Sequence, residues 1–502
     1  MEMLKAYING KWVTSKTTEY TPVYDPSTGE VIAQAPRCTP EEIEQAIAAA
    51  KAAFPGWANT PAIKRAQILY RVRELLIEHM DELTYSVARE NGKAWAEAQG
   101  DVLKAKEGTE VACSIPTLLN GMGESLRDAS SGFDTVLYRE PLGVFAGIIP
   151  FNFPAMIPMG WMTPQCVACG NTIVLKLASF TPMTAMRIAE LYHEAGLPDG
   201  VINLVTCSRK EADLFLSHPD VKGISFVGST SVGKYIYSQA AAAGKRVQAL
   251  CEAKNHALVL EDAPIHRTAA GIINAAFGCA GERCMALPVV CVQESIADEL
   301  VKAVVDLARN LRVGPAYDKS SDMGPVINEA HRNSILSWIE KGVAEGAQLV
   351  LDGRGVTVPG YEHGFYVGPT IFDHVKPGMS VGDREIFGPV LCFKRVKDFE
   401  EGLAVMNANP FANGSVIFTQ NGHYAREFTK RTDGGMVGVN VGIPVPVGMF
   451  PFSGHKNSFF GDLHCLGRDG IRFYTETKCV TTRWFDEEEK QQRKVSTWDG
   501  TI

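Results

Sequence analysis

The stretch Phe277-Gly-Cys-Ala-Gly-Glu-Arg-Cys-Met-Ala-Leu-Pro288 is the one around which the rest of the chain is interpreted. Gly278 and Gly281 permit unusual backbone angles just before Cys284, and Arg283 precedes that cysteine directly. A cysteine is a strong nucleophile as a thiolate, and a neighbouring cation lowers its pKa. The stretch therefore predicts a nucleophilic Cys284. A cysteine taken alone is more often a small buried residue, so the other motifs of the chain must decide.

Composition indicates a globular protein of more than one domain. The chain has 502 residues, enough for two or three domains, and 45% of them are hydrophobic. A net charge of -8 argues against a nucleic-acid-binding surface. Twelve cysteines are scattered along the chain, and the first residues have no signal-peptide character. These features favour a cytoplasmic protein with reduced thiols.

Residues 141–175 contain no charged side chain and are long enough to span a bilayer. Five prolines and several glycines interrupt this segment, which is a poor fit to a continuous membrane helix. We therefore expect a strand, a loop and a buried helix, and no membrane contact. Cys166 and Cys169 have redox-motif spacing, but they are interpreted as two core thiols on that helix.

The first half of the chain alternates apolar strands with amphipathic helices. Short strands around turns are expected over residues 5–35, and helices from Thr39 to about residue 115. Four buried strands follow with helices between them, at 144–149, 170–176, 200–205 and 221–227. This order predicts a parallel sheet, whose ligands bind at the carboxyl ends of the strands. Lys176, Ser229 and the loop that carries Asn152 lie at those ends.

The second half repeats the alternation of strands and helices. Strands are expected at 255–260 and 288–293, and a turn into a strand at 384–390, while the Pro/Gly-rich passage 442–461 predicts loops near a site. The turn Gly228–Gly233 lacks the usual dinucleotide fingerprint. It either receives a phosphate at a helix N-terminus or simply begins a helix.

Five ordered motifs resemble those of the aldehyde dehydrogenase superfamily over nearly the whole chain. They are Pro150-Phe-Asn-Phe-Pro154, Lys176, Phe226-Val-Gly-Ser-Thr230, Gly281-Glu-Arg-Cys284 and Glu385-Ile-Phe-Gly-Pro389. Three further stretches are similar to the methylmalonate-semialdehyde dehydrogenase branch: Ala253-Lys-Asn-His256, Gly281-Glu-Arg-Cys-Met-Ala286 and Phe450-Pro-Phe-Ser-Gly454. That branch oxidises a methylmalonate or malonate semialdehyde with NAD, loses carbon dioxide and passes the acyl group to coenzyme A.

The resemblance implies an α/β fold of two doubly wound parallel-sheet domains and a small β oligomerisation hairpin. A dinucleotide-binding domain would take residues 1–125 and 147–250, and a catalytic domain residues 251–450. Oligomerisation strands would lie at 126–146 and 473–485, with the second segment pairing with the hairpin of a neighbouring subunit. The implied assembly is a homodimer or a homotetramer.

The resemblance also assigns roles to individual residues. Cys284 is the nucleophile, and the side-chain amide of Asn152 stabilises the oxyanion. Arg283 and Lys104 match the two residues that bind the substrate carboxylate, although the family has arginine at both positions. The residues implied to contact the cofactor are Ile149, Phe151, Lys176, Ser179, Gly228, Ser229, Cys251, Glu385 and Phe387. No metal is implied.

Departures from the family pattern leave three questions open. The hydrolytic members carry a glutamate base where this chain has Leu250, which fits acyl transfer to coenzyme A. Glu252, two residues further on, is an alternative base for hydrolysis to the free acid. Ser179 replaces the glutamate that repels a 2′-phosphate, so NADP is possible beside NAD. Lys104 in place of arginine leaves the identity of the short acidic semialdehyde open.

Overall fold

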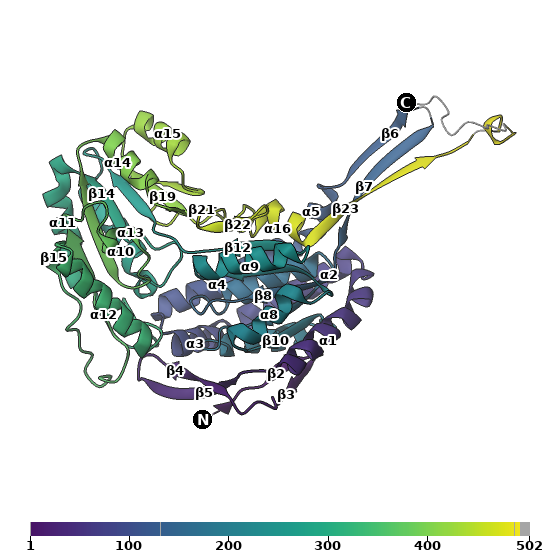
Figure 1. The fold of residues 1–502 in the computed structure, drawn as a ribbon, viewed down its shortest axis with the longest axis horizontal. Coiled ribbons are helices and arrows are strands. Elements are labelled where there is room, and N and C mark those ends of the chain that lie inside the picture. The colour runs from purple at the N-terminus through teal and green to yellow at the C-terminus, as the bar shows by residue number, and fades with distance from the viewer. Residues whose placement is uncertain (1, 131, 486, 492–502) are drawn as a thin grey trace.

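The computed structural model describes residues 2–130, 132–485 and 487–491, which form two sheet-centred units and a projecting arm (Figure 1). The first unit is an eight-stranded sheet in the order β22-β12-β11-β8-β9-β10-β2-β3. Its strands are β2 (Ala6–Ile8), β3 (Lys11–Val13), β8 (Val144–Ile148), β9 (Thr172–Lys176), β10 (Ile202–Val205), β11 (Val221–Val227), β12 (Arg246–Leu250) and β22 (Phe459–Gly461).

The five central strands of this sheet, β8 to β12, are parallel. The chain runs outward from β8 through β9 to β10, then crosses to β11 and β12 on the other side of β8. The order reverses between β8 and β11, and ligands of such sheets bind at the carboxyl ends beside that reversal. The connections are η1 (Ile157–Met162), α6 (Thr163–Ala168), α7 (Met183–Glu194), α8 (Arg209–Ser217) and α9 (Thr230–Ala242).

The amino-terminal helices pack against the first sheet. They are α1 (Pro40–Ala58), α2 (Ala62–Glu78), α3 (Met80–Asn91) and α4 (Trp95–Cys113). Helix α1 begins at the predicted capping box, in which Thr39 and Glu42 satisfy each other's backbone N–H groups. A Cβ at Gly108 of α4 or at Gly160 of η1 would overlap the backbone of the other element. These glycines hold α4 close to the loop that follows β8.

The second unit is a seven-stranded sheet in the order β15-β16-β17-β14-β13-β19-β20. Its strands are β13 (His256–Val259), β14 (Val289–Gln293), β15 (Gln348–Leu351), β16 (Thr370–Asp373), β17 (Val390–Val396), β19 (Gly414–Phe418) and β20 (Met436–Val439). All but β15 are parallel. Helices α10 (Ile265–Phe277), α11 (Glu294–Arg309), α12 (Glu329–Ala344), α13 (Ser380–Asp383), α14 (Phe399–Asn407) and α15 (Gly422–Arg431) accompany it.

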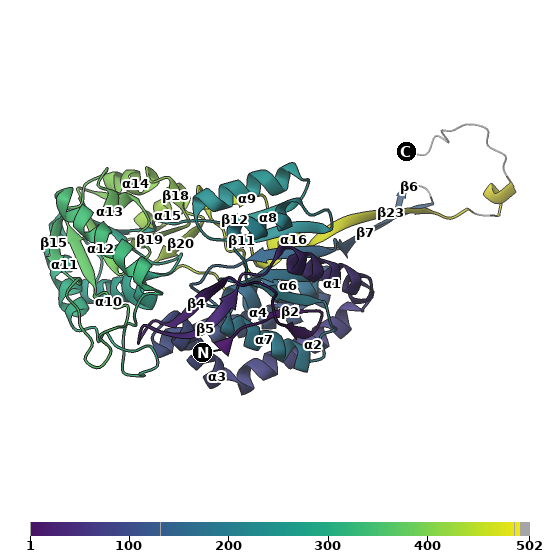
Figure 2. The same cartoon turned by 60° about the horizontal axis from the view of Figure 1, so that its bottom comes forward.

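A three-stranded sheet forms the arm, which projects from the side of the first unit away from the second (Figures 1 and 2). It consists of β6 (Glu124–Ser130), β7 (Phe133–Pro141) and β23 (Thr475–Arg483), with β7 in the middle. The sequence predicted that the C-terminal strand pairs with the hairpin of a neighbouring subunit, and this is wrong. Helix α16 (Gly467–Tyr474) runs directly into β23, so Thr475 pairs with Pro141 of the same chain.

The segment 141–175 has the predicted succession of strand, loop and buried helix. Cys166 lies in α6 and Cys169 caps it, and both thiols are buried. Within the part of the chain that the structure describes, no helix has the length and apolar character needed to cross a bilayer. All twelve cysteines are unpaired.

Candidate active site

The cysteine loop connects α10 to β14 and contains a run of left-handed residues. Cys279, Ala280 and Gly281 have φ values of 51°, 49° and 74°. A Cβ at Gly281 would overlap the carbonyl group of Gly388, so glycine is required at this close approach. The loop thereby meets the turn that carries Glu385 and leaves Cys284 partly exposed at the wall of a pocket.

The backbone carbonyl of Cys284 is fixed by two side-chain amides from the second unit. Asn255 Nδ2 donates to it at 2.9 Å and Asn413 Nδ2 at 3.2 Å. Asn255 lies in one of the quoted family motifs, whereas nothing in the sequence around Asn413 signalled this role. Both bonds orient the peptide of the nucleophile.

Asn152 is buried beside the cysteine loop, as its predicted role requires. Its Nδ2 donates to the carbonyl oxygen of Glu282 at 3.1 Å. The neighbouring carbonyl of Phe151 accepts from Asn91 Nδ2 at 2.9 Å and from Thr181 Oγ1 at 3.0 Å. The first bond joins the loop after β8 to the cysteine loop, and the other two join it to α3 and to the segment before α7.

The thiol of Cys284 is not activated by Arg283. Burial raises the pKa of Cys284 to about 12, and the nearby Glu385 carboxylate acts in the same direction. Arg283 lowers that pKa by less, because its charge is shared with Glu97 in an ion pair of 2.5 Å. Arg283 thus acts in the direction that the sequence predicted, but burial and Glu385 outweigh it, and the pKa of Cys284 is raised.

Glu385 and Phe387 lie across the cysteine loop in the turn before β17. Glu385 Oε1 accepts from the backbone N–H of Ala253 at 2.9 Å, and burial raises the pKa of this carboxyl to about 8. Phe387 has a φ of 61°, and its carbonyl lies 2.7 Å from His331 Nε2, which donates to it. The sequence analysis did not identify His331, which lies on α12 without a motif around it.

A cavity of about 250 Å³ lies at the carboxyl ends of β8, β9 and β11. Four residues predicted to contact the cofactor line it: Ile149, Lys176, Gly228 and Ser229. Burial lowers the pKa of Lys176. The structure brings these four together, whereas Ser179, Phe151 and Cys251 are not among the residues that line the cavity.

The same cavity has polar residues that the sequence did not single out. Asp213 accepts a hydrogen bond of 3.1 Å from the hydroxyl of Tyr235, and the Arg209 guanidinium lies 4.9 Å from the centre of that ring. All three line the cavity wall that α8 and α9 supply. Residues of this kind on helix surfaces carry no sequence signal of their own.

Glu252 points toward helix α9. Its Oε2 accepts from the backbone N–H of Thr230 at 2.8 Å, at the first residue of that helix. Leu250, at the position of the family's usual base, is buried in the apolar core. The carboxylate that raises the Cys284 pKa belongs to Glu385. Leu250 has no carboxylate, and the carboxylate of Glu252 is bound to α9. Neither residue therefore presents a free carboxylate to the thiol.

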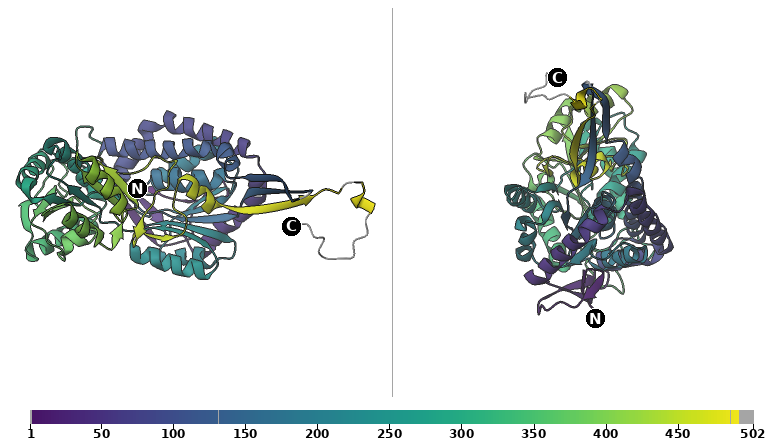
Figure 3. Two further views of the ribbon diagram at one scale, coloured as in Figure 1. Left: turned by 90° about the horizontal axis from the view of Figure 1, so that it is seen from above. Right: turned by 90° about the vertical axis from the view of Figure 1, so that its right-hand side faces the viewer.

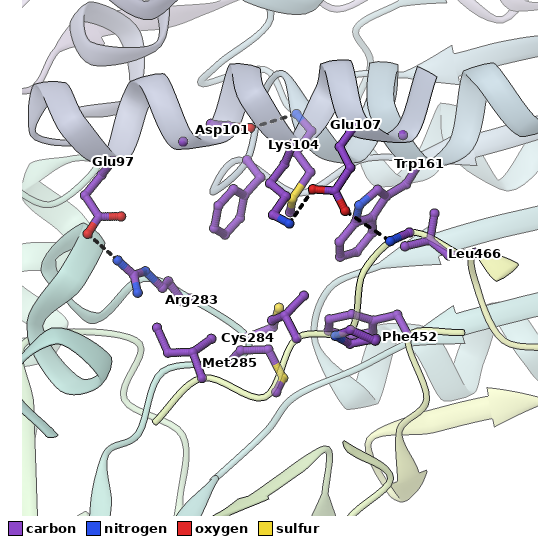
Figure 4. A pocket seen from close by; sticks show the side chains of 18 residues that line it. Glu97, Asp101, Lys104, Glu107, Trp161, Arg283, Cys284, Met285, Phe452 and Leu466 are labelled. Atoms are coloured by element: carbon purple, nitrogen blue, oxygen red, sulfur yellow. Dashed lines mark hydrogen bonds and ion pairs between the residues drawn. The ribbon is translucent and has the colours of Figure 1, made fainter. Parts of the chain in front are cut away.

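A second pocket, of about 400 Å³, opens at Cys284 between α4 and the loops of the second unit (Figure 4). Arg283 and Lys104 both line it, as predicted, and Arg283 is held by Glu97 while Lys104 pairs with Glu107 at 2.5 Å. Its apolar wall is formed by Phe153, Met156, Trp161, Met285, Ile443, Val445, Pro446, Phe452 and Leu466.

The fold and the arrangement of residues around Cys284 are those of one enzyme family. A model of the aldehyde dehydrogenase family matches residues 12–480. The chain therefore belongs to the aldehyde dehydrogenase family. The predicted family and α/β fold are confirmed.

Its relatives narrow the comparison further. The chain is 50% identical over 484 residues to malonate-semialdehyde dehydrogenase 2 of Geobacillus kaustophilus (strain HTA426), covering 96% of this chain and 99% of the relative. A putative methylmalonate-semialdehyde dehydrogenase from Sinorhizobium meliloti 1021, complexed with NAD, has a TM-score of 0.95 and 41% identity, covering 97% of this chain and 99% of that one. The methylmalonate-semialdehyde dehydrogenase from Oceanimonas doudoroffii has a TM-score of 0.95 and 43% identity, covering 98% and 100%.

Proposed function

We propose that this enzyme oxidises a short acidic semialdehyde of the malonate or methylmalonate type with NAD and transfers the acyl group to coenzyme A. The observation that carries the acyl transfer is the segment after β12. Leu250 is buried and apolar, and Glu252 is engaged with the N-terminus of α9. Water therefore lacks a proton acceptor beside the thioester, and a thiol acceptor is favoured.

The residues around Cys284 divide the work of the first half-reaction. The Cys284 sulfur loses its proton to solvent and bonds to the aldehyde carbon, while the C=O π electrons move to the oxygen, which becomes an oxyanion. Asn152 Nδ2 and the backbone N–H of Cys284 are the donors assigned to that oxyanion. Bound NAD would supply the hydride acceptor, so that collapse of the oxyanion would expel a hydride from the former aldehyde carbon and leave a thioester on Cys284. Lys176 and Ser229 hold the adenosine and phosphate end, and Glu385 with Phe387 the nicotinamide end.

In the second half-reaction the coenzyme A thiol attacks the thioester carbon, and the Cys284 thiolate leaves. Before this transfer the carboxylated thioester loses carbon dioxide: the C–C bond electrons pass into a thioester enolate, which takes a proton from water at the α-carbon. Arg283 and Lys104 are assigned to the substrate carboxylate, because both cations line the pocket that opens at the thiol. The relatives named as malonate-semialdehyde dehydrogenases support this substrate class.

Two further features of the reaction are the choice of cofactor and the fate of the thioester. Ser179 carries no charge to repel a 2′-phosphate, which favours acceptance of NADP as a second cofactor. The alternative fate of the thioester is hydrolysis with Glu252 as the base. Its position argues against this, because the carboxylate is directed to the N-terminus of α9 and Glu252 is not among the residues that line the pocket at Cys284.

The same proposal covers assembly and location. The division into 1–125 with 147–250, 251–450 and the strands at 126–146 and 473–485 is retained. The arm exposes Leu126, Tyr138 and Trp484, with 62%, 52% and 74% of their surface accessible. Apolar surface of this kind supports a homodimer or homotetramer in which a second copy covers the arm. Twelve unpaired cysteines support a cytoplasmic location.

The test is rapid mixing of enzyme, NAD and 3-oxopropanoate, with and without coenzyme A. Without coenzyme A we expect a burst of NADH of about one per active site and then slow turnover. With coenzyme A, steady NADH production and an equal amount of acyl-coenzyme A are expected. Full-speed turnover without coenzyme A would instead make this a hydrolytic semialdehyde dehydrogenase.

A further inference from the structure

The charged side chains in the wall of the pocket at Cys284 are all paired with opposite charges. Arg283 pairs with Glu97 and Lys104 with Glu107, each at 2.5 Å. The third carboxylate, Asp101, pairs with the buried Lys93 at 2.9 Å. Three cations thus meet three carboxylates, and net charge gives this pocket no preference for an anionic substrate.

The cations assigned to the substrate carboxylate differ in how firmly they are held. Arg283 is buried, its Nη2 is bound to Glu97, and its Nε donates to Cys279 Sγ at 3.2 Å. A guanidinium has five N–H donors, so Arg283 retains donors for a further acceptor. Lys104 has 43% of its side chain exposed, and its ammonium group is bound to Glu107.

Glu107 is fixed from two sides. One carboxylate oxygen contacts Lys104, and the other accepts from the backbone N–H of Gly448 at 3.1 Å. Gly448 belongs to the loop that supplies Ile443 and Val445 to the pocket. A substrate carboxylate that approaches Lys104 therefore meets a carboxylate already in place, and like charges at such range repel. Figure 4 shows Lys104 and Glu107 side by side on α4, across the pocket from Cys284.

We propose that Glu107 is a specificity-determining residue that neutralises Lys104 and so widens the substrate range to uncharged short aldehydes. This inference rests on the proposed function, because it concerns the substrate pocket of that reaction. Arg283 then provides the stronger carboxylate contact and the Glu107-paired Lys104 a weaker one, while the apolar wall around Trp161 and Phe452 accepts an uncharged chain. The enzyme therefore prefers an acidic semialdehyde over its uncharged counterpart less strongly than it would if both Arg283 and Lys104 were unpaired.

The decisive experiment measures kcat/KM for 3-oxopropanoate and for propanal in wild-type enzyme and in Glu107→Gln. The amide keeps an oxygen for Gly448 N–H and removes only the charge. We expect the kcat/KM for 3-oxopropanoate divided by that for propanal to rise roughly threefold to tenfold in Glu107→Gln, which is the range for a partly exposed charge pair. The change should lie in KM, and Lys104→Met should move the ratio in the opposite direction.

The matched control is Glu110→Gln. Glu110 lies on the same helix but is paired with Lys106 and Arg73 outside the pocket. The Glu110→Gln change alters the protein's net charge by the same amount as Glu107→Gln. Because it does so outside the pocket, the ratio of the two kcat/KM values should stay at the wild-type value. An unchanged or lower ratio in Glu107→Gln would overturn the inference. A fall in both rates by one factor would show that Glu107 only supports the loop.

A second readout does not depend on turnover. Propionate and propionamide have the same shape and differ in charge, and each can protect Cys284 from alkylation by iodoacetamide. Glu107→Gln should strengthen protection by propionate alone, by a similar factor. Equal protection by both compounds in wild type and variant would refute the role of Glu107. Absence of 3-oxopropanoate oxidation in wild type would count against the proposed function, and this protection assay would still test Glu107.

Discussion

The side-chain amide of Asn152 donates to the carbonyl oxygen of Glu282 at 3.1 Å, two residues before the nucleophile. This bond holds the amide against the cysteine loop and leaves its second N–H for the oxyanion. Asn152→Ala should lower the rate of the NADH burst by about 10²- to 10³-fold, the effect of losing one oxyanion donor. Rapid-mixing absorbance measures it, with cofactor binding as the control. A burst at the wild-type rate would remove Asn152 from this role.

Alkylation kinetics test the protonation state of Cys284. Because burial raises its pKa to about 12, the thiolate is scarce at neutral pH. Its alkylation by iodoacetamide should therefore accelerate about tenfold per pH unit from pH 7 to 9, as the thiolate fraction grows. Cys284→Ala should remove this reaction and all turnover above a percent or so, on the order of two decades of rate. A plateau below pH 8 would show a thiol activated without substrate.

The cofactor end of the site is tested at Lys176 and Ser179. Lys176→Ala should weaken both NAD and NADP by about tenfold, because a charge-assisted hydrogen bond to the ribose is lost. Ser179→Glu should weaken NADP alone, since a carboxylate would face the 2′-phosphate. Titration by quenching of protein fluorescence gives both affinities. If NADP affinity is unchanged in Ser179→Glu, that side chain does not face the ribose.

Glu252 accepts a hydrogen bond from the backbone N–H of Thr230, beside the Ser229 turn assigned to the cofactor phosphates. A carboxylate there competes with a phosphate for the same positive end of α9. Glu252→Gln should therefore bind NADH several-fold more tightly, by roughly the value of one helix-end charge. Its slow turnover without coenzyme A should equal that of wild type. Glu261→Gln, an exposed carboxylate away from both cavities, is the control. Loss of that turnover in Glu252→Gln would restore Glu252 as a base.

Much of the fold follows from local sequence, because buried parallel strands are continuous apolar runs and helices carry their own caps. The strands ending at Lys176 and Val227 were predicted almost to the residue. The position of β22 in the first sheet was not predicted, because its antiparallel pairing with β12 depends on packing between distant segments. Such pairings leave no local pattern to detect.

The site was predictable to the extent that its residues lie in motifs. Cys284, Asn152 and Glu385 come together as their ordered motifs implied. Glu97 and Glu107 were missed, because acidic residues on an amphipathic helix usually face water. Arg283, the partner of Glu97, is far away in sequence, and only the fold shows that Glu97 cancels its charge.

The pairing of β23 with β7 has a consequence for how the protein is made. Strand β7, Phe133–Pro141, is synthesised long before its partner β23, Thr475–Arg483. During translation one edge of β7 stays open, and an unpaired edge is a template for pairing with another chain. The arm is thus completed only when β23, yellow in Figure 3, pairs with β7. Nascent chains should accordingly depend on chaperones until the ribosome releases the carboxyl terminus.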